Sequence, residues 1–214
     1  MERKYGRIAS FDGRSRAFPI RALIAEKRPR SYTWPCGVVL DQGSEGACTG
    51  FAVAHEAAAW PCRVWGIDNK IARAIYRRAR QLDDWPGEDY EGSSVLAAMK
   101  AGQERGWYQE YRWCFSEEEL SLAVSRKGPC VLGINWYEGM TETDSDGYIQ
   151  PTGELLGGHA ILCKGYNVKK QRYTLHNSWG KAWGLNGACY ISKSNMAKLL
   201  NQRGEACIPV VRAK

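Results

Sequence analysis

The sequence predicts an α+β fold in which a mainly helical N-terminal lobe and an antiparallel β lobe enclose a cleft. Helix signals dominate residues 48 to 127, and short apolar runs separated by turn residues dominate from about 129 to 214. Helices and strands segregated in this way are typical of two packed layers, and the groove between two lobes is the usual place for a site. We expect a basic extension over 1–34 and one folded domain over 35–214, a length that can bury a sizeable core.

Four segments carry the helix signals. The first begins at Cys48, after a glycine-rich loop, and continues with small apolar residues that favour a buried helix. Residues 70–82 place apolar side chains at helical spacing, and residues 93–106 end on a glycine stop. Residues 116–128 open with a serine cap and an acidic first turn and close on basic residues, which complements the helix dipole.

Four later segments predict the sheet. They are short, apolar or alternating, and bounded by glycine, aspartate or lysine turns. They read PCVLGINWY (129–137), GHAILCKGYN (158–167), RYTLHNSWG (172–180) and GACYISK (187–193). We find no internal repeat and no low-complexity tract.

The net charge of +7 is concentrated at the N-terminus, where residues 1 to 35 hold nine Lys or Arg and three Asp or Glu. Such an arm can dock on an acidic partner or on nucleic acid, although a solvated leader is the simpler expectation. No apolar run is long enough to span a bilayer, and the start of the chain lacks the apolar core of a secretory signal. We therefore expect no membrane association and a cytoplasmic location.

The eight cysteines show no C-x-x-C pair, and there are only three histidines. This spacing gives no support for a zinc site, so we expect no metal and no cofactor. Without a secretory signal we expect free thiols, most of them core residues.

Cys48 is the exception, because it lies in the first turn of its predicted helix. Unpaired backbone amides and the helix dipole there favour a negative charge and lower the pKa of a thiol. A buried, inert thiol is the alternative interpretation. The residue types therefore make Cys48 a candidate nucleophile.

A cysteine nucleophile needs a base, and histidine is the side chain whose ordinary pKa lies nearest neutrality. His55 follows Cys48 by seven residues on the same predicted helix, about 10.5 Å along its axis, which is out of reach. His159 and His176 both lie in the predicted sheet, and Asn177 can orient an imidazole ring. From the residues alone both histidines stay candidates.

Three segments resemble the motifs of papain-like cysteine peptidases. DQGSEGACTGFA resembles their oxyanion-and-nucleophile segment, GHAILCKGYN their histidine strand and HNSWGKAWGLNGACYIS their asparagine segment. EDYEGSSVLAAMKAGQERG resembles their glycine-containing cleft segment and the helix that follows. The resemblance covers about residues 34 to 195 and is nearest to compact bacterial or phage-encoded members without disulfides. It implies a papain-like two-lobed fold and a cysteine endopeptidase acting on polypeptides.

The resemblance also implies residue roles. Cys48 becomes the nucleophile, His159 its imidazole partner and Asn177 the residue that orients the ring, while Gln42 donates its amide to the oxyanion. Four further residues are implied to line the substrate cleft. These are Gly92, Ser93, Gly158 and Trp179, the last of which also covers the hydrogen bond between Asn177 and His159 together with Trp183.

Two positions depart from the family pattern. Glu45 replaces a disulfide-forming cysteine, and its carboxylate raises the pKa of the nearby thiol unless it turns outward or meets an arginine. Thr49 replaces the usual tryptophan, and we have no physical explanation for it beyond altered packing. The basic leader is too short for a long inhibitory propeptide. Part of it can lie across the cleft as a small lid, although packing against the outside of the lobes is the simpler expectation.

Two alternatives share these residues. The same triad serves a peptidoglycan amidopeptidase or a peptide ligase, because acyl-enzyme chemistry does not itself select the acyl donor or acceptor. An inactive peptide-binding module would keep the cleft but not the chemistry. All four catalytic positions are filled, which argues against the binding module.

Overall fold

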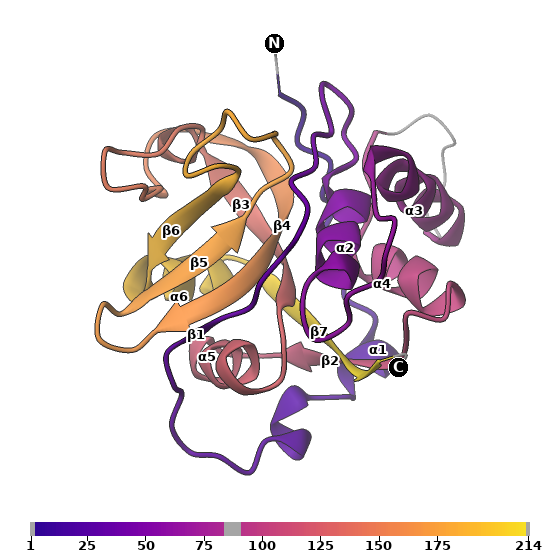
Figure 1. Cartoon of the computed structure of the whole chain (residues 1–214), viewed down its shortest axis with the longest axis horizontal. Helices are drawn as coiled ribbons and strands as arrows, with labels where there is room; N and C mark the ends of the chain where they lie inside the picture. The colour runs from indigo at the N-terminus through magenta and orange to yellow at the C-terminus, as the bar shows by residue number, and fades with distance from the viewer. Residues whose placement is uncertain (1–2, 84–90, 213–214) are drawn as a thin grey trace.

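The computed structural model describes residues 3–83 and 91–212 of the chain. The helices α2 (Cys48–Ala58), α3 (Asn69–Leu82) and α4 (Val95–Glu104) lie on one side of the molecule, and an antiparallel sheet lies on the other (Figure 1). The predicted two-lobed α+β architecture is confirmed.

The helical lobe is built around α2, which is buried along nearly all of its length. A Cβ on Gly50 would lie 2.5 Å from the carbonyl oxygen of Ala72, so glycine here allows α2 and α3 to pack closely. Asp68 and Ser94 cap the N-termini of α3 and α4 by accepting backbone N–H groups of the first turn. The expected helices after Cys48, over 70–82 and over 93–106 are therefore present.

The β lobe contains one sheet of seven strands in the order β2-β7-β3-β4-β5-β6, with β1 paired to β4. All pairs are antiparallel. The strands are β1 (Tyr32–Thr33), β2 (Tyr108–Cys114), β3 (Cys130–Tyr137), β4 (Leu155–Asn167), β5 (Arg172–His176), β6 (Ala188–Ser192) and β7 (Glu205–Arg212).

Two longer helices, α5 (Glu117–Arg126) and α6 (Lys193–Asn201), pack against the sheet. Three short elements lie outside these layers: α1 (Gly13–Arg16), η1 (Ile20–Leu23) and η2 (Glu138–Met140).

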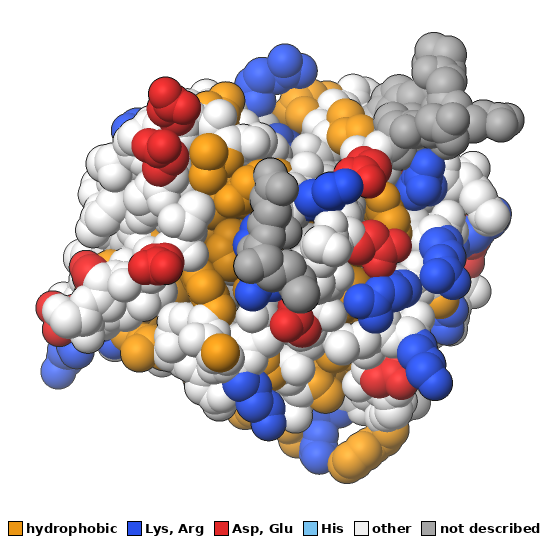
Figure 2. All heavy atoms as spheres, turned by 90° about the horizontal axis from the view of Figure 1, so that it is seen from above, with side chains coloured by type: hydrophobic (Ala, Val, Ile, Leu, Met, Phe, Trp, Pro, Cys, Tyr) orange, Lys and Arg blue, Asp and Glu red, His pale blue; other side chains and the backbone are white. Residues whose placement is uncertain are grey.

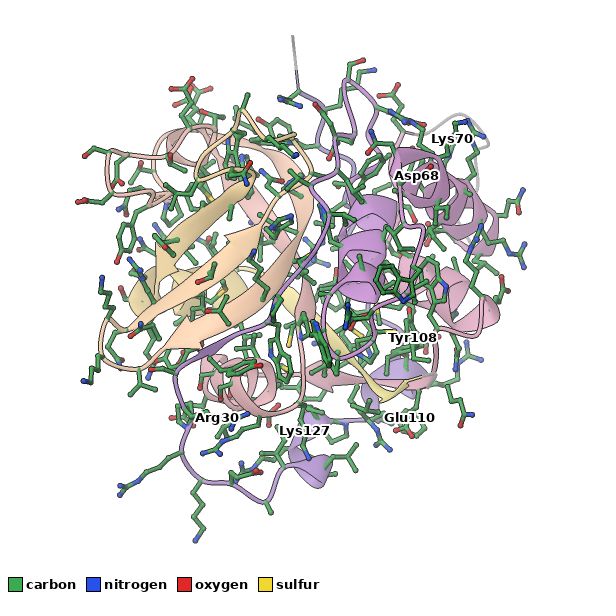
Figure 3. All side chains as sticks on the ribbon, in the orientation of Figure 1. Arg30, Asp68, Lys70, Tyr108, Glu110 and Lys127 are labelled. Carbon is green, nitrogen blue, oxygen red and sulfur yellow. The ribbon has the colours of Figure 1, made fainter. Side chains whose placement is uncertain are left out.

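Two elements within residues 48–127 do not belong to the helical lobe predicted for that range. β2 is a strand that pairs with β7 at the edge of the sheet, and α5 packs on the core of the sheet. The aromatic side chains of β2 suit a pleated surface, and its pairing with β7 makes it a strand. One of them, Tyr108 (labelled in Figure 3), donates its hydroxyl to the Met99 carbonyl of α4, with 2.6 Å between the oxygens. This strand therefore also contacts the helical lobe.

β4 connects the two hydrophobic cores through its alternating faces. Ala160 and Leu162 belong to the core around α2, whereas Ile161 and Cys163 belong to the core between the sheet and α5. His159 therefore stands on the strand that separates the lobes.

The N-terminal segment folds back onto the domain. It enters between the helices and the sheet near the point marked N in Figure 1, continues through α1 and η1, and reaches β1. The Phe18 carbonyl accepts the Trp113 N–H at 3.0 Å, and Arg30 donates to the Ser125 carbonyl at 2.9 Å. Within the described ranges, every helix is too short or too polar to cross a bilayer.

Candidate active site

Cys48 is the first residue of α2, so its sulfur lies at the helix N-terminus. The side chain is fully buried. The Ala160 backbone N–H of β4 donates to the sulfur at 3.3 Å. The sequence places these residues 112 positions apart, and the packing of α2 on β4 brings the thiol beside the neighbour of His159.

His159 is held by Asn177. Its Nε2 lies 2.8 Å from the Asn177 side-chain oxygen, which also accepts the Ser178 N–H at 2.9 Å. The other ring nitrogen, Nδ1, is buried and has no hydrogen-bond partner among the described residues. Nδ1 is therefore the nitrogen left available to the Cys48 thiol.

Aromatic side chains cover the imidazole. Trp179 lies 5.1 Å from the His159 ring and 5.3 Å from Trp183, measured between ring centroids. Trp136 of β3 is closer to the His159 ring, at 4.6 Å, and the motifs did not reveal it. These rings exclude water from the bond between His159 and Asn177.

Gln42 is buried and contacts Ser178, the residue that follows Asn177. Its side-chain oxygen accepts the Ser178 hydroxyl at 2.7 Å, which fixes the orientation of the amide. Its Nε2 donates to the Glu45 carbonyl at 2.8 Å and to the Lys4 carbonyl at 3.2 Å. The group expected to bind an oxyanion thus binds a carbonyl oxygen of the N-terminal segment.

Burial dominates the electrostatics of both reacting groups. It raises the pKa of the Cys48 thiol, against the lowering effect of the Ala160, Gly6 and Thr49 N–H groups. It lowers the pKa of His159 to about 4, although the bond to Asn177 opposes this. Both groups are neutral at pH 7 in this closed arrangement, so the expected ion pair does not form in it.

Glu45 meets an arginine. Arg73 Nε lies 2.9 Å from the Glu45 carboxylate. This ion pair neutralises the negative charge that Glu45 places near Cys48. Thr49 is fully buried, and its hydroxyl has no hydrogen-bond partner among the described residues. All eight cysteines are free thiols.

His55 and His176 form a separate buried pair with ring centroids 4.5 Å apart. His55 Nε2 accepts the Leu40 N–H at 3.2 Å. His176 contacts the Val38 carbonyl through Nε2 at 2.9 Å and Lys164 Nζ through Nδ1 at 3.1 Å. His176 thus has its own partners, whereas the residue that follows His159, Ala160, contacts the Cys48 sulfur.

This pair predicts a loss of stability in acid. Burial and Lys164 lower the pKa of His176 to about 4, so between pH 6.5 and pH 4 the unfolded chain binds a proton that the folded chain excludes. Above about pH 6.5 His176 does not reduce the free energy of unfolding. By pH 5 the proton that only the unfolded chain binds lowers this free energy by about 2 kcal/mol. Urea unfolding at pH 7 and pH 5 measures this, and His176→Gln is expected to show a smaller loss. An equal loss in both proteins contradicts the prediction.

The N-terminal segment lies between Ser93 on one side and Gly158 of β4 on the other. The Gly6 carbonyl accepts the Ser93 N–H at 2.8 Å, and Ile8 donates to the Ser93 carbonyl at 3.0 Å, so the segment runs parallel to this strip. On the other side the backbone N–H of Arg7 donates to the Gly158 carbonyl at 2.9 Å. Glycine at position 158 permits this contact, because a Cβ there would lie 2.2 Å from the Arg7 carbonyl oxygen. We refer to residues 3–8 below as the cleft segment.

Further contacts hold the start of the cleft segment. Arg3 pairs with Asp41 at 3.2 Å and donates to the Trp179 carbonyl at 3.1 Å. Lys4 pairs with Glu91 at 2.7 Å. Gly92 has a φ of 120°, and a Cβ there would lie 2.5 Å from the Gly6 carbonyl oxygen.

All four implied substrate-lining residues, Gly92, Ser93, Gly158 and Trp179, therefore contact this segment. Residues 88–90, which begin the matching sequence motif, lie outside the described residues.

The expectation that the leader lies outside the lobes is wrong for this segment. Its positive side chains meet acidic groups of the same chain. On the face drawn in Figure 2, Lys and Arg side chains gather over the helical half with Asp and Glu among them, so they form no continuous basic patch there. In the described part of the chain, no three His, Cys, Asp or Glu side chains cluster as metal ligands.

Solved structures with a similar fold include xylellain, a cysteine protease from Xylella fastidiosa. It matches with a TM-score of 0.74 and 22% identity over 99% of both chains. Procathepsin L2 from the larval midgut of Tenebrio molitor matches with a TM-score of 0.64 and 17% identity over 98% of this chain and 78% of that one. At these identities the similarity concerns the fold.

Sequence comparison finds related proteins. An uncharacterised peptidase C1-like protein of Acanthamoeba polyphaga mimivirus is 24% identical over 212 residues, 74% of this chain and 67% of that protein. Cathepsin Q of Rattus norvegicus is 33% identical over 85 residues, 36% of this chain and 25% of that protein. A family model described as papain family cysteine protease matches residues 87–207, a range that contains His159 and Asn177.

Proposed function

Because this chain belongs to the papain family of cysteine proteases and is a cysteine peptidase, we propose that it is an endopeptidase in which Cys48, His159 and Asn177 form the catalytic triad. The observation that carries this proposal is the bond of 2.8 Å from Asn177 to His159 Nε2, which leaves Nδ1 free on the strand that contacts the Cys48 sulfur.

The thiol becomes reactive when the cleft segment leaves. Water then reaches the crevice and removes the burial that keeps both groups neutral. The proton moves from Cys48 to His159, and the resulting thiolate is stabilised by the imidazolium and by the N-terminus of α2.

The thiolate attacks a substrate carbonyl carbon, and the carbonyl oxygen becomes negative. The Cys48 backbone N–H and the Gln42 side-chain amide stabilise this oxygen. The Lys4 carbonyl at 3.2 Å from Gln42 Nε2 supports this role, because it occupies the acceptor position of that amide. Losing one such donor costs about 3 kcal/mol of transition-state stabilisation.

His159 then donates its proton to the leaving amine, and the substrate remains as an acyl group on sulfur. The neutral imidazole then takes a proton from water, whose oxygen attacks the acyl carbon; the C–S bond breaks, the acid leaves, and the thiolate and imidazolium are restored. The rings of Trp179 and Trp136 keep His159 bonded to Asn177 throughout.

The acyl side of an extended substrate lies between Gly92, Ser93 and Gly158. Ser93 offers both an N–H and a carbonyl to a peptide, as it does to Gly6 and Ile8 of the cleft segment. The leaving side lies toward Trp179. While the cleft segment occupies these groups, the full chain is inhibited.

The substrate that donates the acyl group distinguishes an endopeptidase from a peptidoglycan amidopeptidase with the same triad. We expect the protein to cleave unfolded casein and to leave muropeptides intact, with products identified by mass spectrometry. Cleavage of muropeptides alone assigns the amidopeptidase, and joined peptides assign a ligase. Turnover of no substrate, even by a variant with a displaced cleft segment, contradicts the peptidase and favours the binding module.

A further inference from the structure

The loop that carries Gln42 is held by one arginine of α3. Arg73 Nε lies 2.9 Å from the Glu45 carboxylate, and Arg73 Nη2 donates to the Gln42 backbone carbonyl at 3.4 Å. One guanidinium therefore contacts both ends of residues 42–45, which we call the oxyanion loop. The same guanidinium lies 5.6 Å from the ring centroid of Phe51, the fourth residue of α2, so it is also held against that helix.

α3 supports this loop at a second point. Asn69, the first residue of α3, accepts the Asp41 backbone N–H through its side-chain oxygen at 3.0 Å. The Asp41 carboxylate in turn accepts the Gly43 N–H at 2.9 Å. The loop therefore meets α3 on one side, while Gln42 is bonded to Ser178 of the β lobe on the other.

The two residues that Arg73 contacts also contact each other through the amide expected to bind the oxyanion. Gln42 Nε2 donates to the Glu45 carbonyl at 2.8 Å, so a shift of Glu45 moves the acceptor that orients this amide. Because Arg73 binds the Glu45 side chain and the Gln42 backbone, it fixes the donor and this acceptor relative to each other.

The oxyanion loop depends on such contacts because it contains little that stiffens it. Gly43 has a φ of 67°, a conformation that favours glycine, and glycine gives up more conformational freedom on folding than any other residue. The ion pair of Arg73 adds little stability of its own, because the two side chains are 33% and 36% exposed. Its effect is on position, where a displacement of about 1 Å costs on the order of 100-fold in rate.

We propose that Arg73 is a positioning residue, which fixes the oxyanion loop so that the Gln42 amide faces the substrate oxygen that becomes negative. This role rests on the proposed function, in which Gln42 is an oxyanion donor. A lysine at position 73 would meet only one of the two acceptors at a time, because an ammonium lacks the planar fork of a guanidinium.

A double-mutant cycle with Gln42 tests this role. The parent is the full chain with Gly6→Leu, which displaces the cleft segment because a Cβ there would lie 1.8 Å from the Gly46 carbonyl oxygen. Arg73→Met is combined with Glu45→Gln, so that no unpaired carboxylate is left near the thiol. On a fluorogenic peptide that copies a casein cleavage site, we expect kcat to fall at least about tenfold and KM to change less than about twofold, because the donor acts in the transition state.

Gln42→Ala removes the donor itself and is expected to lower kcat at least about 100-fold. Added to Gln42→Ala, the changes at Arg73 and Glu45 are expected to lower kcat less than about twofold further, since the side chain that they position is gone. A role confined to stability would lower kcat by the same factor in both backgrounds. The matched control is Arg78→Met with Glu104→Gln, which removes another partly exposed ion pair of α3, at 2.7 Å, and keeps kcat.

An equal loss of kcat with and without Gln42, or no loss at all, overturns the role of Arg73 and leaves the triad in place. If Gln42→Ala is as active as the parent, the oxyanion role in the proposed function is overturned, and the role of Arg73 falls with it. A parent without turnover overturns the proposed function as a whole, and this role with it.

Arg73→Lys repeats the cycle if Arg73→Met with Glu45→Gln fails to fold. A smaller loss of kcat that disappears in Gln42→Ala supports the role of Arg73. A loss that persists in Gln42→Ala, or no loss in either background, overturns it.

Discussion

Gly6→Leu is expected to raise peptide turnover by the full chain at least about tenfold, because side-chain overlap of this size cannot be relieved within the close packing of the crevice. The added Cβ would meet the Gly46 carbonyl oxygen at 1.8 Å, and this oxygen belongs to the backbone. The cleft segment must therefore leave Ser93 and Gly158, and the substrate gains access to Cys48. Initial rates of casein cleavage measure the effect.

Gly13→Leu is the matched control for this change. Gly13 lies in the same leader, and a Cβ there would meet no atom within 4 Å. We expect its turnover to equal that of the unchanged chain. If Gly6→Leu folds normally and is no more active than Gly13→Leu, the cleft segment does not inhibit the enzyme.

Cys48→Ala in the Gly6→Leu background is expected to lower kcat by at least about 1,000-fold, because no other nucleophile can form the acyl intermediate. Cys36→Ala is the control, since that thiol is half-buried and bonds the Val38 and His55 carbonyls away from His159. The rate of casein cleavage measures both variants. Residual turnover above one tenth in Cys48→Ala would show that another group performs the chemistry.

Much of the fold follows from local sequence signals. The helix at Cys48 and the strand at His159 are strongly patterned, and their order along the chain matches a known family. β2 was not predicted, because Glu110 and Arg112 interrupt its alternation of apolar and polar side chains. These two residues pair with each other at the edge of the sheet. Its strand state depends on pairing with β7, about a hundred residues later.

The candidate site was predictable to a similar extent. The motifs indicated Gln42, Cys48, His159 and Asn177. In the structure Asn177 contacts His159, Gln42 accepts the hydroxyl of the neighbouring Ser178, and the Cys48 sulfur accepts the N–H of Ala160, which follows His159. The partner of Arg7 was not predictable, because Glu205 lies 198 residues away and no local pattern marks a long-range ion pair.

Three expectations remain predictions. They are the cytoplasmic location, the bacterial or phage relationship and an external acidic or nucleic-acid partner for the leader. The acidic groups that the leader meets in the structure belong to the same chain.

Alkylation of the eight thiols by iodoacetamide at pH 6, mapped by peptide mass spectrometry, measures directly whether position 48 carries an activated sulfur beneath the N-terminal segment. In Gly6→Leu we expect Cys48 to react at least about ten times faster than any other cysteine, because only a thiol paired with imidazolium is ionised at that pH. In the unchanged chain and in Gly13→Leu we expect it to react slowly. Uniform slow labelling in Gly6→Leu, or rapid labelling of Cys48 in the unchanged chain, would contradict this expectation.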